Sequence, residues 1–356
     1  MQKKKKMTVI LAGVLAAALV IVVPVFIRHS RTQQSYESTG YAMGTYMLQT
    51  VYGKNGKNAA DKASEKIHKL ENTISWRISS SEIAKLNKAA GKGSVSIGSE
   101  TFSILKTSLD VAVKSEGAFD PTILPASSLW GFGGDKQRLP SESEIEDAVK
   151  LVDYSRLKID ANGKSACLTS SGMGIDLGGI GKGAACDVAV EAYKSAGADC
   201  GIVAAGGSIG TYGEKADGSL WHIAVRDPAS AEDESAAMGQ IDIGSGFVST
   251  SGSYEKFFVK NGKTYHHLLN PKTGYPENNG LVSVTVMAKS GALSDALSTA
   301  CFILGREKGC ELLQKYGAGG IFVNSKNKVF VTDNLKSKFK ISKSSYKLDV
   351  KNKAYN

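Results

Sequence analysis

TYHHLLNPKTGYPENNGLVSVTVMAKSGALSDALSTACFILG, residues 264–305, predicts a turn, a strand and a helix in close succession. His267 precedes an Asn-Pro-Lys-Thr-Gly turn, a strand is expected at residues 281–287, and a helix is expected at residues 293–304. These elements bring a histidine and a polar helix face into one short stretch of the chain.

One face of the predicted helix carries oxygen ligands. Asp295, Ser298 and Thr299 stand three and four residues apart, and residues at that spacing are neighbours on a helix surface. A carboxylate and two hydroxyls are hard oxygen donors, which Mg²⁺ takes alongside substrate phosphates. Taken singly, Asp295 would be a surface acid, and a lone strand histidine such as His267 is more often structural than catalytic. Together they suggest chemistry on a phosphate or pyrophosphate.

The pattern of the whole chain predicts an α+β fold with mixed, largely antiparallel sheets and packed helices. Long helices come first and hairpin-linked strands follow, which argues against a regular βαβ repeat. Asn162-Gly163 and Asn261-Gly262 are hairpin signals. Capping boxes are expected at Ser79 with Glu82 and at Ser141 with Glu144. Helices are expected at residues 60–74, 102–113, 182–193, 293–304 and 307–316, and strands at residues 46–52, 201–205, 221–225, 240–243, 257–259, 264–268 and 281–287.

The N-terminal residues predict a membrane anchor. Four lysines in residues 1–7 precede an apolar run at residues 8–27, and 20 apolar residues span roughly one bilayer core. The flanking lysines favour a cytoplasmic N-terminus and place everything after Arg28 outside the cytoplasm. Cleavage within residues 15–18 is the alternative. The expected organisation is a cytoplasmic basic segment (1–7), a signal-anchor helix (8–27), a linker (28–40), a catalytic domain (41–334) and a basic tail (335–356).

Charge is concentrated at the two ends of the chain. The net charge is +10, but residues 1–31 hold six Lys or Arg and no acid, and residues 335–356 hold seven Lys and one Asp. The segment between them is close to neutral, which argues against a nucleic-acid binder. The five cysteines form no CxxC pair, so neither a disulfide framework nor a zinc site is expected.

Residues 172–183, GMGIDLGGIGKG, are the densest glycine run and lead into a predicted helix. Backbone amides at a helix N-terminus favour anions, and glycine allows a phosphate to come close. The GxGxxG pattern does not occur, and a P-loop would need glycine at Asp176 and a hydroxyl residue at Gly183. Close packing of a strand on a helix explains such a run about as often. Lys182 either pairs with a phosphate or is a solvated first-turn lysine.

A second loop combines aromatic rings, a carboxylate and glycines. It consists of GAFDPT at residues 117–122 and LWGFG at residues 129–133. A flat ring system could stack there while its edge meets backbone groups and a carboxylate. A loop pinned to the core by its Phe and Trp is an equally good interpretation.

These motifs, taken in order, resemble the ApbE-like FAD:protein FMN transferase family from about Tyr41 to Thr332. AMGT at residues 42–45, the Ser75-Trp76 element, GAFDPT with LWGFG, and residues 174–183 (similar to DLGGIAKG) each match a family segment. The series is completed by residues 249–252, 267–274 and 295–299. The chain departs from the family in three places, with Gly181 for the usual alanine, Asn270 for a frequent aspartate and Ser208 for another.

The resemblance implies a set of site residues. His267 and Asp295 would be catalytic, with His267 the base for an incoming hydroxyl. Mg²⁺ would be held by the carbonyl of Gly181 with Asp295, Ser298 and Thr299. FAD, the donor substrate, would contact Met43, Trp76, Ala118, Phe119, Asp120, Gly178, Ala184 and Leu269.

The implied activity splits FAD at its pyrophosphate, moves FMN to a Thr or Ser hydroxyl of another extracytoplasmic protein and releases AMP. The nearest internal match to an acceptor motif, residues 217–220, has Leu220 where the hydroxyl should stand. Two alternatives remain, an FAD pyrophosphatase in which water attacks and a non-catalytic flavin-binding electron carrier.

Overall fold

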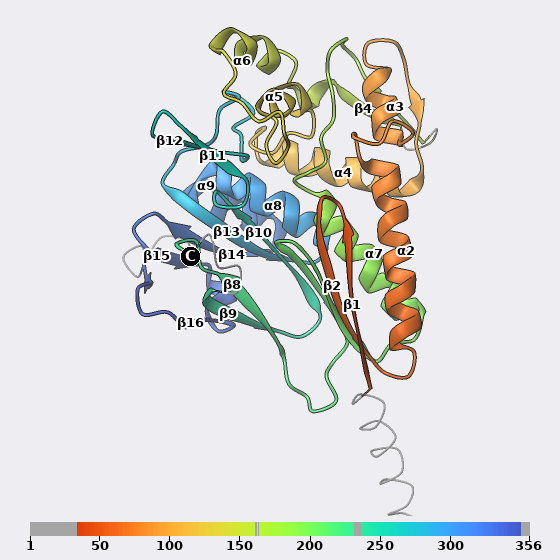
Figure 1. The fold of residues 1–356 in the computed structure, drawn as a ribbon, viewed down its shortest axis with the longest axis vertical. Helices are drawn as coiled ribbons and strands as arrows, with labels where there is room; N and C mark the ends of the chain where they lie inside the picture. The colour runs from red at the N-terminus through yellow and green to blue at the C-terminus, as the bar shows by residue number, and fades with distance from the viewer. Residues whose placement is uncertain (1–33, 161, 163, 231–235, 350–356) are drawn as a thin grey trace, which may run out of the picture.

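The computed structural model describes residues 34–160, 162, 164–230 and 236–349. Within that part of the chain, none of the helices is long and apolar enough to cross a membrane. The anchor expected at residues 8–27 lies outside the described residues. Helices and mostly antiparallel sheets are combined in one α+β structure, as the sequence predicts (Figure 1).

A large sheet forms the middle of the molecule. Its strand order is β1-β2-β6-β7-β10-β13-β14-β15-β17, and its pairs are antiparallel apart from the parallel β15–β17 pair. Its strands are β1 (Ser35–Ala42), β2 (Thr45–Tyr52), β6 (Cys200–Ala205), β7 (Ser208–Tyr212), β10 (Gly246–Gly252), β13 (Leu281–Ala288), β14 (Gly319–Asn324), β15 (Lys328–Val331) and β17 (Lys347–Leu348).

Three small sheets complete the strands. One contains β16 (Phe339–Ile341), β9 (Ala237–Ile243) and β8 (Trp221–Arg226); a second contains β3 (Val95–Ser96), β5 (Ser165–Leu168) and β4 (Leu157–Asp160); the third is the β11 (Phe257–Lys260)–β12 (Lys263–His266) hairpin. The β4–β5 and β11–β12 pairs confirm the hairpins predicted at the two Asn-Gly signals.

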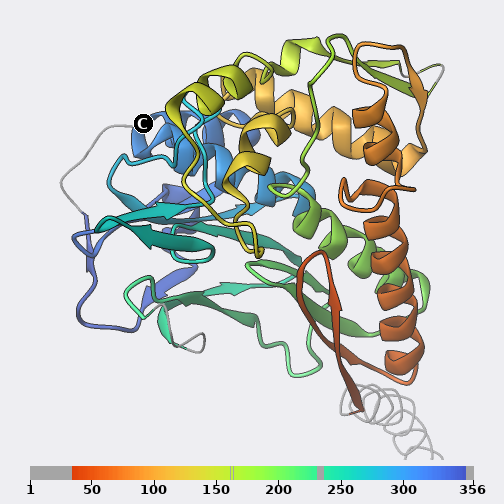
Figure 2. The same cartoon turned by 45° about the horizontal axis from the view of Figure 1, so that its top comes forward.

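Most of the helices cover one face of the large sheet, and the β8–β9–β16 sheet with the short helix α10 (Asp333–Lys336) covers the other (Figures 1 and 2). The main core joins α7 and α8 to the sheet, while a second core packs Trp221 and Ile223 against Val248 and Ile321. The helices are α2 (Gly56–Ile74), α3 (Glu82–Lys88), α4 (Ser99–Lys114), α5 (Leu124–Trp130), α6 (Glu142–Val149), the 3₁₀ helix η1 (Tyr154–Arg156), α7 (Gly181–Ser195), α8 (Gly291–Leu304), α9 (Arg306–Tyr316) and α10 (Asp333–Lys336).

Of the two capping boxes predicted from the sequence, one is confirmed and one is wrong. The Ser141–Glu144 capping box at α6 is confirmed, with both reciprocal hydrogen bonds present. The box expected at Ser79 is wrong, because Ser81 caps α3 by accepting from the Ala84 amide. The Glu82 carboxylate instead accepts from the amide of Gly98, at the start of α4.

The segment after residue 334, expected to be a basic tail, is folded as far as Asp349. β16 pairs with β9, and β17 pairs with β15. The lysines of this segment hid the pattern because they alternate with Leu335, Phe339 and Tyr346, whose side chains are buried. The buried Asp227 holds the segment from the other side, since it accepts hydrogen bonds from Lys343 and Tyr346.

Candidate functional site

The site is built where α7 crosses α8. A Cβ atom at Gly183 would lie 1.9 Å from the carbonyl oxygen of Gly291, and one at Gly291 would lie 2.2 Å from the carbonyl oxygen of Gly183. Only glycine allows two helix backbones to approach this closely. Asp187 supports the crossing by accepting hydrogen bonds from the first amides of α8, those of Gly291 and Ala292. Gly183 therefore serves the packing of α7 on α8, whereas the packing expected from the sequence was that of a strand on a helix.

Asp295 is buried in this crossing. One carboxylate oxygen, Oδ2, accepts a hydrogen bond of 3.0 Å from the amide of Gly183. The other, Oδ1, lies 3.6 Å from the ammonium nitrogen of Lys182. Gly181, whose carbonyl is a predicted metal ligand, is the first residue of α7, and Asp295, the predicted carboxylate ligand, belongs to α8. The two predicted ligands therefore lie on the two helices that cross here. Lys182 is thus the ion-pair partner of Asp295 rather than a solvated lysine.

A row of hydroxyl groups joins α8 to β10. Ser251 Oγ lies 2.8 Å from Ser298 Oγ and 3.2 Å from Thr299 Oγ1. Ser298 also donates to the carbonyl oxygen of Asp295 at 2.8 Å and is fully buried, whereas Thr299 is partly exposed. One helical turn earlier, Ser249 Oγ lies 2.8 Å from Ser294 Oγ. Ser251 is a site residue that sequence reasoning missed, although its alternation with Ser249 in the STSG segment was a signal.

The loop at residues 117–122 reaches the same place. A Cβ built at Gly179 would lie 3.2 Å from the Phe119 ring and 3.3 Å from Thr299 Oγ1, so these residues are near neighbours. Ala118 and Ala184, which the family resemblance assigns to FAD, are both buried in the main core. The sequence therefore identified residues from three separate segments that the fold brings together.

The Asp120 carboxylate is occupied within its own loop. Oδ1 accepts from the amide and the hydroxyl of Thr122, and Oδ2 accepts from the amide of Tyr154. Burial raises the pKa of Asp120 despite these hydrogen bonds. The carboxylate stabilises the loop that presents Ala118 and Phe119.

Asp176 and Gly178 form the exposed side of the glycine-rich run. Asp176 Oδ1 accepts from the Gly178 amide at 2.9 Å, and its Oδ2 accepts from Ser127 at 3.0 Å. Gly178 itself is exposed, and its carbonyl accepts from Lys182 at 3.3 Å. The turn therefore has a free surface directly beside the Lys182 ammonium.

His267 follows β12 and is fixed by its backbone amide, which donates to the carbonyl of Lys256 at 3.0 Å. Its Nδ1 atom is buried and has no hydrogen-bond partner in the described structure. Burial, followed by the positive charges of Lys182 and Lys256, lowers the pKa of His267 to about 3. The imidazole is therefore neutral near pH 7, and it is under the influence of the Lys182 ammonium that also pairs with Asp295.

Lys256 is a second missed residue. Its side chain is exposed and lies along the LWGFG loop, since a Cβ at Gly133 would be 3.4 Å from Lys256 Cδ. Partial desolvation, then the charges of Lys182 and Arg77, lower the pKa of Lys256. These three cations come from separate segments, so no local motif could have indicated that they gather at one site.

The NPKTG turn is held against the LWGFG loop. Trp130 Nε1 donates to the carbonyl of Gly274 at 2.9 Å, and Leu269 packs with Trp130 in a small apolar cluster. Asn270 donates to Glu277 at 2.7 Å and accepts from the Lys272 amide at 2.9 Å. An amide in place of the family's frequent aspartate therefore suffices to hold this turn.

Met43 and Trp76 lie at the end of α2. The amide of Met43, whose φ is +54°, donates to Glu71 Oε1 at 2.8 Å. Trp76 follows the last turn of α2, with the Arg77 guanidinium 4.1 Å from the centre of its ring. The same helix end touches α7, because Ile74 Cδ1 lies 3.6 Å from the Cβ position of Gly181. Both predicted FAD contacts thus stand near the start of α7.

One further feature limits how this site could bind a metal ion. Across the described residues, no three His, Cys, Asp or Glu side chains gather in a group that could hold a metal ion. A cation at Asp295 would therefore rely on neutral protein oxygens and on a ligand.

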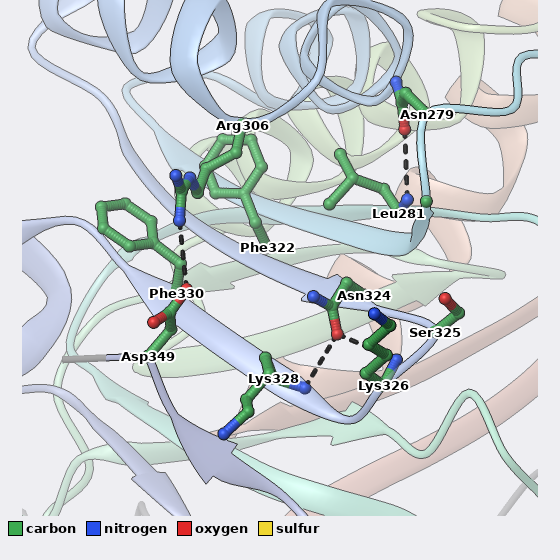
Figure 3. Close-up of a pocket in the computed structure, with 11 residues that line it drawn as sticks. Asn279, Leu281, Arg306, Phe322, Asn324, Ser325, Lys326, Lys328, Phe330 and Asp349 are labelled. Atoms are coloured by element: carbon green, nitrogen blue, oxygen red, sulfur yellow. Dashed lines mark hydrogen bonds and ion pairs between the residues drawn. The ribbon is translucent and has the colours of Figure 1, made fainter. Parts of the chain in front are cut away.

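A separate hollow of about 270 Å³ lies at the β14–β15 hairpin, beside Arg306, Asn324 and Asp349, and none of the predicted site residues lines it (Figure 3).

Comparison with known proteins finds consistent similarity over this region. The model of the ApbE family matches residues 43–322. FAD:protein FMN transferases of Treponema pallidum and Escherichia coli K12 are 30% and 27% identical to the chain. Each alignment covers 82% of this chain, and 84% and 85% of the respective relative.

Solved structures agree. The crystal structure of the ApbE protein from Thermotoga maritima superposes with a TM-score of 0.78 at 33% identity, covering 85% of this chain and 99% of that one. The flavin transferase ApbE from Vibrio cholerae has a TM-score of 0.75 at 25% identity, covering 86% and 99%.

Proposed function

The chain belongs to the ApbE family, and from this membership we propose that it transfers FMN from FAD to a hydroxyl of another protein. The curated relatives are named FAD:protein FMN transferases, so the enzyme is a transferase that flavinylates proteins. The observation that carries the proposal for this chain is the α7–α8 crossing, where Asp295 meets the start of α7 and Lys182.

The donor set at the crossing fits Mg²⁺. Asp295 supplies one carboxylate, Gly181 a carbonyl, and Ser298 and Thr299 hydroxyls, all of them hard oxygens. A single carboxylate is typical of magnesium sites that are completed by substrate phosphates. When bound, Mg²⁺ would neutralise charge on the pyrophosphate oxygens of FAD.

The remaining side chains would hold different parts of FAD. Lys182, Lys256 and Arg77 supply positive charge for the pyrophosphate, which suits a reaction that depends mostly on positioning and charge neutralisation. We assign the rest of FAD to contacts from Met43, Trp76, Ala118, Phe119, Asp120, Gly178, Ala184 and Leu269. The Asp120 contact would come from its backbone, because its carboxylate is already occupied.

His267 is the proposed base. The acceptor oxygen attacks the phosphorus of the FMN half, the bond from that phosphorus to the bridging oxygen breaks, and AMP leaves. The hydroxyl proton passes to the His267 imidazole, which is neutral and has an unpaired ring nitrogen. A free-protein pKa of about 3 makes a weak base, but an anionic pyrophosphate beside Lys182 and Lys256 would raise that pKa.

One incubation distinguishes this function from its alternatives. The described domain is mixed with FAD, Mg²⁺ and an acceptor domain that carries the relatives' kind of Ser/Thr motif, and the acceptor is weighed. A gain of the FMN mass supports the transferase. Free FMN and AMP with an unmodified acceptor would indicate an FAD pyrophosphatase, and intact bound FAD would indicate an electron carrier.

We propose further that the acceptor is a separate extracytoplasmic protein. The support is the sequence itself, in which a lysine-flanked apolar run at residues 8–27 predicts a single-pass anchor with the cytoplasmic end first. Fusing a reporter enzyme that is active only outside the cytoplasm after residue 40 would test this. Activity is expected, and an inactive but expressed reporter would contradict the orientation.

A further inference from the structure

Lys182 provides the positive charge nearest to the Asp295 carboxylate. Its Nζ atom lies 3.6 Å from Asp295 Oδ1, and the Asp295 side chain is only 2% exposed while that of Lys182 is 28% exposed. A buried carboxylate without a compensating cation is strongly unfavourable. The Gly183 amide satisfies Oδ2 but carries no full charge. The ammonium of Lys182 is therefore the cation that compensates the buried Asp295 carboxylate.

The same position conflicts with a divalent cation. A metal ion bound to Asp295 and the Gly181 carbonyl would stand within a few ångströms of the Lys182 ammonium, and like charges at that distance repel strongly in a partly buried site. Lys182 can leave, because it extends from the first turn of α7, is partly exposed and is otherwise held by one hydrogen bond to Gly178. Its flexible four-carbon stem permits the movement.

We infer that Lys182 is the counter-ion of Asp295 in the metal-free protein and that a divalent cation displaces it from the carboxylate. Only the destination of the released ammonium rests on the proposed function, since the pyrophosphate of FAD would then receive it. Metal and FAD would assist each other's binding through the Lys182 side chain. The pyrophosphate of FAD would draw the Lys182 ammonium away from the metal site, and the metal would release that ammonium from Asp295 to pair with the pyrophosphate.

The first test measures metal affinity without FAD. Mn²⁺ is titrated calorimetrically into metal-stripped protein at pH 8. Lys182→Met should tighten the Kd about tenfold, equivalent to about 1.4 kcal/mol. Lys182→Arg keeps the charge and should stay within about twofold of wild type. Lys256→Met removes a nearby positive charge that is not paired with Asp295. It therefore shows how much the Kd for Mn²⁺ changes from the loss of positive charge alone.

An unchanged or weaker Kd in Lys182→Met would overturn the inference. Equal tightening in Lys256→Met would also overturn it, because the effect would then come from overall charge and not from the Asp295 contact.

The second test uses the wild-type protein, so it does not depend on a variant that folds. Lysines are acetylated with acetic anhydride, and the rate at each site is followed by peptide mass spectrometry. Adding Mn²⁺ should speed the labelling of Lys182 severalfold while Lys256 stays constant. Slower or unchanged labelling of Lys182 would contradict the displacement. Neither test measures transfer, so their failure would leave the transferase proposal standing, and failure of transfer would leave these results unaffected.

Discussion

The amide nitrogen of Gly183 donates a 3.0 Å hydrogen bond to Oδ2 of Asp295, and this one contact ties the glycine-rich segment to the acidic helix face. The two residues are 112 positions apart, and they meet only because glycines at 183 and 291 let α7 and α8 touch. The predicted metal ligands Gly181 and Asp295 are brought together by this crossing.

Gly183→Ala should therefore disrupt both stability and metal binding. Its Cβ would lie 1.9 Å from the carbonyl oxygen of Gly291, which forces the helices apart. Overpacking of this kind costs about 1–3 kcal/mol or more. Urea unfolding measures the loss. Gly181→Ala is the matched control, since its nearest neighbour would be 3.6 Å away, and it should retain the stability of the wild type. Equal stability of both variants would contradict the crossing.

Thr299→Val should weaken Mg²⁺ binding more than Ser298→Ala. Ser298 is fully buried and its hydroxyl already donates to the Asp295 carbonyl, whereas Thr299 is partly exposed beside Gly179. The main effect of Ser298→Ala should be a free energy of unfolding lower by about 1 kcal/mol, through the lost hydrogen bond. Calorimetric titration and urea unfolding on both variants separate the two effects. A larger loss of affinity in Ser298→Ala would reverse the assignment.

His267→Ala should slow transfer far more than it weakens FAD binding, by about 10²–10⁴-fold if His267 is the general base. Single-turnover transfer and fluorescence titration of FAD measure the two quantities separately. His266→Ala is the control, because the Nε2 atom of that ring donates to the Glu277 carbonyl and the ring packs on Phe302. Transfer at the wild-type rate in His267→Ala would remove its assigned role.

The pH profile should depend on whether FAD is bound. Burial, Lys182 and Lys256 lower the pKa of His267 to about 3 in the free protein. A base must be deprotonated, so the acid limb of kcat/KM, which reports the free enzyme, should lie well below pH 6.5. Bound pyrophosphate raises that pKa, so the acid limb of kcat should lie at higher pH. Lys256→Met should move the kcat/KM limb upward, and an unmoved limb would argue against this charge effect.

Asp227 should contribute to stability through the folded C-terminal segment. Burial alone would raise its pKa, but hydrogen bonds from Lys343 and Tyr346 outweigh burial and lower the pKa to about 2. The stabilisation is therefore fully present above its ordinary pKa of about 4 and disappears as pH falls towards 2. Asp227→Asn should lose about 2 kcal/mol at pH 7, and about half as much at pH 3, in urea unfolding.

Asp61→Asn is the control for Asp227, because Asp61 pairs with Lys57 on the exposed surface of α2. Its stability should equal that of the wild type at every pH. A constant difference between Asp227→Asn and wild type from pH 3 to 8 would contradict the pKa argument.

Much of the fold was predictable because local patterns agreed with the final contacts. The Asn-Gly hairpins and the amphipathic helix at residues 60–74 form as their residues predict. The C-terminal strands were not predicted, because their lysines hid the apolar residues between them, and their partner Asp227 lies more than 100 residues earlier.

The site shows the same limit. Asp295 and Thr299 could be identified from spacing on one helix, and the resemblance added the loop residues. Lys256 and Arg77 could not be placed, because their meeting with Lys182 depends on the residues before β11 and after α2 converging on the start of α7 in three dimensions. The low pKa of His267 was also unpredictable, since the sequence offers only its ordinary value and burial decides the shift.

The most direct measurement is the mass of an acceptor domain after incubation with FAD and Mg²⁺, with wild-type protein and with Asp295→Ala in parallel. Wild type should add one FMN to a Ser or Thr of the acceptor and release an equal amount of AMP, and Asp295→Ala should add none. An acceptor of unchanged mass with wild type, or full flavinylation by Asp295→Ala, would contradict the account.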